Sequence, residues 1–61
     1  MRDWMRDERL SKNMTQDEVS KAAGISQNFY ANIENGKRDP SIKTAKAIAD
    51  ILRFPWQRFY E

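Results

Sequence analysis

The sequence predicts an all-α fold, a compact bundle of five helices. Apolar residues recur at the helical spacing of three and four, and no segment alternates apolar and polar residues as a half-buried strand would. Helix-capping residues and glycines punctuate the chain, although its 61 residues include only two Gly and two Pro. The short intervals leave no room for a linker, so we expect residues 1–61 to form a single domain.

The composition excludes several classes of site. Cys and His are both absent, which removes disulfides, thiolate nucleophiles, the commonest general base and the usual zinc ligands. The Asp and Glu residues are scattered, so we expect neither an enzyme nor a cofactor. The start of the chain is charged and the apolar runs are short, which predicts a cytoplasmic protein. The net charge of +2 is compatible with nucleic acid but does not argue for it.

A first helix is expected over about Asp3–Lys12. Its apolar residues are Trp4, Met5 and Leu10. The pattern is imperfect because Glu8 stands near the middle of the expected apolar face.

The second helix has the clearest start signal in the chain. The hydroxyl of Thr15 can cap its first turn, and Glu18 can reach back to the Thr15 amide, which makes a capping box. Met14 and Val19 flank this start as a hydrophobic staple. Gly24 interrupts the helix at a position where a left-handed residue is readily accommodated.

The next two helices are also bounded by caps. Ser26 can cap the third helix, and Asn35-Gly36 ends it. Pro40-Ser41 begins the fourth helix. The expected inward stripe of this fourth helix consists of Ile42, Ala45, Ile48, Ala49 and Leu52.

A short terminal helix is expected after a break at Phe54-Pro55, since proline suits a first helical turn. This helix carries Trp56, Phe59 and Tyr60. These aromatic residues either complete the core or cover a contact between two copies of the chain. The sequence does not divide them between the two roles.

Residues 16–35 have the spacing of a helix-turn-helix unit, two helices joined by a tight turn containing Gly. The small Ser20 stands where the helices would cross, and Gly24 stands where the turn needs a positive φ. Apolar residues fill the five places that face the core, namely Val19, Ala23, Ile25, Tyr30 and Ile33. The second helix of such a unit can lie in a DNA major groove.

Two stretches resemble the Cro/repressor (XRE-like) helix-turn-helix family. They are Met-Thr-Gln-Asp-Glu-Val-Ser-Lys-Ala-Ala-Gly-Ile-Ser at 14–26 and Asn-Ile-Glu-Asn-Gly-Lys-Arg-Asp-Pro-Ser-Ile at 32–42. The resemblance extends over nearly the whole chain, to the terminal Phe-Pro-Trp-Gln-Arg-Phe-Tyr-Glu. It implies a lambda-repressor-like bundle that binds operator DNA, commonly as a symmetric dimer. Ser20, Glu8 and Pro55 depart from the residues common in the family, and the last two bear on local packing.

The third helix is the candidate reading element. With Tyr30 and Ile33 turned inward, its outward face carries Gln27, Asn28, Ala31 and Asn32. Amide side chains can donate to and accept from adenine, and a methyl group can contact thymine. An ordinary solvent face is the alternative for the helix alone, but the motif presents this face to DNA. The resemblance places the family's base contacts on Gln27, Asn28 and Asn32.

Phosphate contacts are expected around this helix, because free amides and the positive end of a helix dipole attract anions. The candidates are Gln16, Ser26, Asn35, Lys37 and Arg38. A solvated loop is the alternative for Lys37 and Arg38, but their place beside the reading helix favours phosphate. Phe29 either packs under the helix or touches thymine methyl groups.

The resemblance also implies an ion pair between Arg9 of the first helix and Glu34 of the third. Such a pair would fix the orientation of the third helix rather than add stability.

The sequence therefore predicts a transcriptional regulator of double-stranded DNA, most simply a repressor that binds an inverted-repeat operator as a homodimer. The alternative is a protein-interaction module, since antitoxins that share this fold bind a partner protein as well as DNA.

Overall fold

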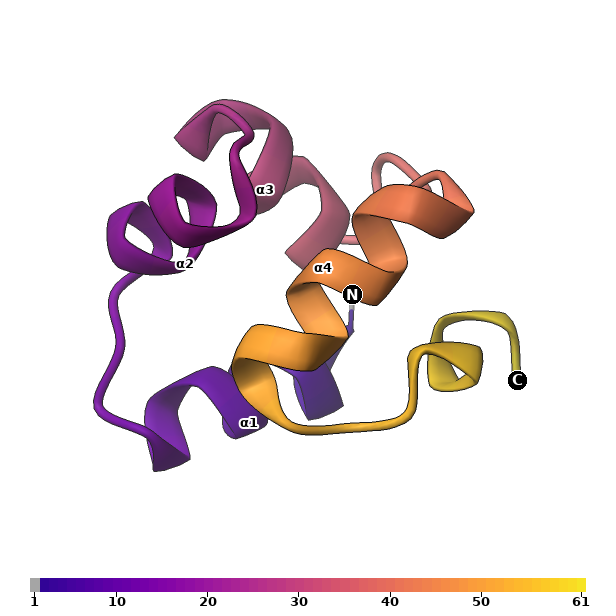
Figure 1. Ribbon diagram of the computed structural model, residues 1–61, viewed down its shortest axis with the longest axis horizontal. Helices are drawn as coiled ribbons and strands as arrows, with labels where there is room; N and C mark the ends of the chain where they lie inside the picture. Colours follow the sequence, from indigo (N-terminus) through magenta and orange to yellow (C-terminus); the bar gives the residue numbers. More distant parts are fainter. Residues whose placement is uncertain (1) are drawn as a thin grey trace.

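The structure, a computed structural model, describes residues 2–61. It contains α1 (Asp3–Ser11), α2 (Gln16–Ala23), α3 (Gln27–Glu34), α4 (Ile42–Leu52) and the 3-10 helix η1 (Trp56–Tyr60). Helices α2 and α3 pack together, α4 crosses the middle of the molecule, and η1 lies beside it (Figure 1). The predicted all-α class is confirmed, and the only difference in helix type is the 3-10 form of the last helix.

The capping hydrogen bonds predicted at the helix starts are present at α2, α3 and α4. At α2, Thr15 Oγ1 accepts from the Glu18 amide at 3.1 Å, and the Thr15 amide donates to Glu18 Oε1 at 2.8 Å. Ser26 and Ser41 start α3 and α4 in the same way, each hydroxyl accepting from the amide three residues on. These bonds satisfy amides that have no partner within their own helix.

Replacing Thr15 with Ala is expected to cost about 1 kcal/mol of stability, because the Glu18 amide loses its acceptor. For a small domain this lowers the melting temperature by about 4–8 °C. Thermal unfolding followed by circular dichroism measures the change. Ser11→Ala is the matched control, because the Ser11 hydroxyl donates to the Glu8 carbonyl and caps no amide. Equal melting temperatures for the two variants would contradict this role of the capping box.

The turn between α2 and α3 has the geometry that the sequence predicted. Gly24 has φ of +74°, and the following Ile25 amide donates to the Ser20 carbonyl at 3.0 Å. Ser20 is 1% exposed where the helices meet, and its hydroxyl donates to the Asp17 carbonyl at 2.9 Å. The turn therefore closes without an unpaired hydroxyl at Ser20.

The core lies between the helices and is formed by side chains from every helix. Its buried apolar members are Met5, Val19, Tyr30, Ile33, Ala45, Ile48, Ala49, Leu52, Phe54 and Phe59. Three aromatic rings pack together at the core. The ring centroids of Trp4, Phe54 and Phe59 lie between 5.1 and 5.5 Å apart. No helix among residues 2–61 is long and apolar enough to cross a membrane.

One predicted inward position was wrong. Ile42 is the first residue of α4 and is 54% exposed, whereas the buried members of the stripe begin at Ala45. Leu10, one of the apolar residues of the first helix, is also 54% exposed. It follows Met5 by five residues and so faces away from it, whereas Arg9, one turn after Met5, takes the inward position.

Candidate nucleic-acid interface

The outward face of α3 carries the amide side chains expected to read bases. Gln27 and Asn28 are exposed, Ala31 and Asn32 are half-buried, and Tyr30 and Ile33 are fully buried on the opposite face. The structure therefore leaves two amides open to a ligand and places the other two candidates partly under neighbouring groups.

Two of the candidate phosphate-contacting residues, Gln16 and Ser26, lie at helix starts. The Ser26 hydroxyl accepts from the Phe29 amide at 3.1 Å, which leaves its own hydrogen free to donate. The side chain of Gln16 instead turns inward, where its amide donates to Glu34 Oε1 at 3.4 Å. In this arrangement the phosphate contact predicted for Gln16 depends on its backbone amide at the first position of α2.

The loop after α3 holds the remaining candidates Asn35, Lys37 and Arg38, all exposed. The amides of Lys37 and Arg38 both donate to the Asn32 carbonyl, at 2.9 and 3.2 Å. The Arg38 guanidinium lies 5.6 Å from the centre of the Phe29 ring. The loop is thereby folded back onto the end of α3, and the Arg38 guanidinium lies against Phe29 of that helix.

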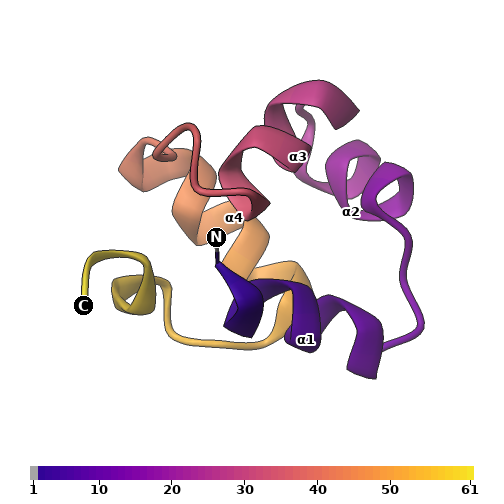
Figure 2. The same cartoon turned by 180° about the vertical axis from the view of Figure 1, so that it is seen from behind.

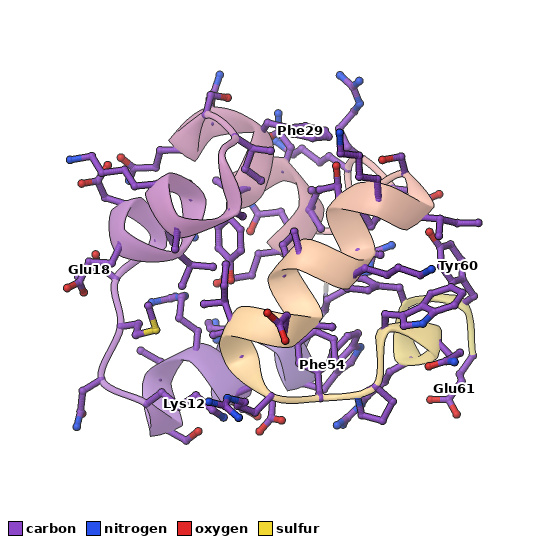
Figure 3. All side chains as sticks on the ribbon, in the orientation of Figure 1. Lys12, Glu18, Phe29, Phe54, Tyr60 and Glu61 are labelled. Carbon is purple, nitrogen blue, oxygen red and sulfur yellow. The ribbon has the colours of Figure 1, made fainter. Side chains whose placement is uncertain are left out.

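Phe29 packs partly against the core and partly under Arg38. Figure 3 shows its ring at the outer surface of α3. The structure thus favours the packing role that the sequence left open for this residue.

The structure brings Arg9 and Glu34 together in a two-pronged ion pair. Arg9 Nε donates to Glu34 Oε2 and Arg9 Nη2 to Glu34 Oε1, both at 3.0 Å. Arg9 Nη1 also donates to the Met14 carbonyl at 2.9 Å, so one side chain links α1, the α1–α2 connection and α3. The planar guanidinium suits this geometry, which no lysine could reproduce.

Burial, hydrogen bonds and charge at this pair shift the pKa values of Glu34 and of the neighbouring Tyr30. Burial opposes ionisation of Glu34, but the hydrogen bonds and charge of Arg9 outweigh it, and the pKa of Glu34 lies below its usual 4.5. Burial and the nearby Glu34 carboxylate raise the pKa of Tyr30. Among residues 2–61, the buried Tyr30 hydroxyl has no hydrogen-bond partner.

This shift predicts a loss of stability in acid. A carboxyl with a lowered folded pKa adds stability above its unfolded pKa of 4.5 and loses it as the pH falls through the folded value. We expect the free energy of unfolding to fall more steeply below pH 4.5 in the parent protein than in Glu34→Gln, measured by urea denaturation. Asp50→Asn, at an exposed site, should keep the steep slope. Parallel profiles for the parent and Glu34→Gln would contradict the prediction.

One contributing residue was not predicted from the sequence. Arg2 donates to backbone carbonyls at the end of α3 and in the following loop, and it pairs with Asp39. Its partners lie more than 30 positions away, so nothing in the local sequence signals the contact. Residues 2–61 bring no three metal-ligating side chains together and enclose no pocket.

The helix-turn-helix family matches residues 5–59 of the chain. The chain belongs to this family. It is an XRE-like helix-turn-helix protein, as the sequence predicted, and its family comprises DNA-binding transcriptional regulators rather than enzymes.

Several curated proteins are similar to this helix-turn-helix chain. An uncharacterized HTH-type transcriptional regulator, YqaF of Bacillus subtilis, is 48% identical over 61 residues, covering all of this chain and 80% of the relative. The ImmF control region 10 kDa protein of Bacillus phage phi105 is 40% identical over 79% of the chain and 53% of its own length. The cryptic phage CTXphi transcriptional repressor RstR of Vibrio cholerae is 29% identical over 84% and 46%, so the chain spans about half of the last two. No solved structure matches.

The terminal aromatics of this helix-turn-helix protein divide between two environments. Phe59 is 8% exposed and belongs to the core, which is the first of the two roles that the sequence left open for it. Tyr60 is 52% exposed, although its hydroxyl donates to the Pro40 carbonyl at 2.9 Å, and Trp56 is half-buried against it. Trp56 and Tyr60 therefore keep surface that the core does not cover.

Proposed function

We propose that this protein is a repressor that occupies an inverted-repeat operator as a homodimer, with α3 in the major groove. The observation that carries the proposal is the exposed face of α3, where Gln27 and Asn28 stand between a capped helix start and a basic loop. Neutral amides can read adenine, and flanking cations and free amides can grip phosphates. The relative RstR, named as a transcriptional repressor, supports the repressing role.

The dimer part of the proposal rests on Trp56 and Tyr60. Both residues belong to η1, which packs beside α4. Tyr60 lies away from Phe29 on α3 (Figure 3). A symmetric contact there would leave both copies of α3 free to enter grooves one DNA turn apart, about 34–36 Å. In this proposal residues 1–61 act as one domain, in the cytoplasm where bacterial or phage DNA is found.

A selection from randomised duplex DNA at near-physiological salt tests the proposal. Enrichment of an inverted repeat with half-sites about one turn apart supports the dimeric repressor. Enrichment of a single half-site keeps the reading role of α3 and removes the dimer. No enrichment by folded protein would contradict DNA reading.

A protein partner is the second candidate function. Ile42 and Tyr60 are large apolar side chains with more than half of their surface exposed, and the Tyr60 hydroxyl bonds the loop just before α4. Apolar surface of this kind is typical of protein contacts when it is contiguous. Failure of the DNA selection would favour this candidate.

A further inference from the structure

Arg2 connects the start of the chain to the far end of α3. Its backbone amide donates to the Glu34 carbonyl at 2.9 Å, so the first described residue lies beside the last residue of α3. In Figure 2 the start of α1 lies below this end of α3. The Arg2 side chain then continues past the helix into the loop that carries Lys37 and Arg38.

The guanidinium of Arg2 has three partners there. Nη1 donates to the Ile33 carbonyl at 2.6 Å and to the Arg38 carbonyl at 3.2 Å, and Nη2 pairs with the Asp39 carboxylate at 2.5 Å. The last carbonyls of a helix lack partners within the helix and form the negative end of its dipole, so a cation is favourable at this place.

The Arg2 side chain is well covered for a charged residue near the surface. It is 15% exposed, whereas its partner Asp39 is 81% exposed. The guanidinium also lies 5.6 Å from the centre of the buried Phe59 ring, so it rests on the core on one side. A charge this covered requires hydrogen-bond partners, and it therefore restrains the carbonyls that it contacts.

Arg38 is consequently restrained on both sides of its Cα atom. Its amide donates to the Asn32 carbonyl at 3.2 Å, and its own carbonyl accepts from Arg2. With the backbone held at both peptide units, the Arg38 side chain extends across α3 to the Phe29 ring. Removal of Arg2 would free the carbonyl side of this residue.

We propose that Arg2 is a positioning residue for DNA binding, which holds the loop so that the Arg38 guanidinium stays at the rim of α3, ready for a phosphate. This inference rests on the proposed function of α3 and its loop. Arg2 acts through Arg38 and makes no phosphate contact of its own. A preset cation loses less conformational freedom on binding than a mobile one.

Two arms test the inference, the first without DNA. In the free protein the Phe29 ring should shift the side-chain proton signals of Arg38 upfield in an NMR spectrum, because the guanidinium lies over the ring. We expect Arg2→Gln to reduce this shift and Arg6→Gln to preserve it. Arg6 is the matched control because it lies on α1 and pairs only with the exposed Asp3 across one turn. An unchanged shift in Arg2→Gln would overturn the inference whatever the protein binds.

The second arm measures the affinity for a labelled duplex of about 20 base pairs across a salt series, at a temperature where circular dichroism shows every variant folded. We expect Arg2→Gln to bind about three- to tenfold more weakly than Arg6→Gln. The salt slope should fall by about one for Arg38→Gln and partly for Arg2→Gln. Once Arg38 is replaced by Gln, adding Arg2→Gln should weaken binding no more than adding Arg6→Gln. The reason is that the guanidinium which Arg2 is proposed to position is then absent.

Equal affinities of Arg2→Gln and Arg6→Gln would overturn the inference, and so would a full further loss on adding Arg2→Gln to Arg38→Gln. Failure of the parent protein to bind any duplex would instead overturn the proposed function. If Arg2→Gln does not fold, Asp39→Asn compared with Asp50→Asn replaces it. Charge alone would strengthen DNA binding in both acid-to-amide variants, whereas loss of positioning weakens Asp39→Asn.

Discussion

Replacing Glu34 with Ala is expected to destabilise the protein by about 3–5 kcal/mol. A domain of this length has a total free energy of unfolding of roughly 3–9 kcal/mol, so this variant is expected to be largely unfolded at 37 °C. The reason is the charge left behind. Glu34 is 2% exposed and Arg9 is 9% exposed, and without the carboxylate the guanidinium keeps only the Met14 carbonyl as an acceptor.

The expected loss measures the cost of leaving one buried charge without its partner. It does not measure the net contribution of the intact ion pair to stability. Replacing both partners together, as Arg9→Met with Glu34→Leu, removes the uncompensated charge and fills the same space with apolar atoms. This double variant should recover most of the stability, apart from the bond to the Met14 carbonyl. Urea unfolding at neutral pH measures all three proteins. Parent-like stability of Glu34→Ala would contradict the buried charge as the cause.

The double variant also separates stability from orientation. The pair joins α1 to the last residue of α3, and Gln16 of α2 donates to the same carboxylate. Apolar side chains can fill this volume but cannot hold three helices at fixed angles by directed bonds. A folded double variant with weakened DNA binding would therefore assign the pair to the orientation of α3.

The parts of the fold that the sequence predicted are those with local causes. The capping box at Thr15, the cap at Ser26 and the left-handed Gly24 each depend on residues within a few positions, and each is present as expected. The inward residues of α4 followed equally well from Ala45 to Leu52, because the helical period decides which face is buried.

The errors have longer-range causes. Ile42 obeys the helical period but is 54% exposed, because the period does not determine how far along a helix its neighbours cover it. The left-handed Arg53, with φ of +63°, ends α4 where no glycine signals a stop. Arg2 contacts the α3 end through backbone carbonyls, which carry no side-chain identity that a pattern could match.

Among the candidate reading residues, too, local periodicity predicted some positions and tertiary packing decided others. The helical period correctly placed Gln27 and Asn28 on the open face opposite Tyr30. The period alone did not reveal that Asn32 is half-buried beside the returning loop, whose amides use its carbonyl. We therefore expect Gln27 and Asn28 to contribute more to DNA reading than Asn32.

Replacing Gln27 or Asn28 with Ala is expected to weaken binding to the selected operator by about 1–3 kcal/mol each, or about 5- to 150-fold. The loss comes from the hydrogen bonds that the removed amide would make to base edges. Both side chains are exposed and outside the core, so the melting temperature should stay within about 4 °C of the parent.

Binding to a random duplex separates reading from general attraction, because phosphate contacts are independent of sequence. We expect the two variants to keep the parent's affinity for random DNA, so that only the ratio of specific to non-specific binding falls. Gln57→Ala is the matched control, since it removes the same amide from an exposed position on η1. If Gln57→Ala loses operator affinity as Gln27→Ala does, or if all variants weaken on both duplexes alike, then α3 contributes no base reading and its amides are an ordinary solvent face.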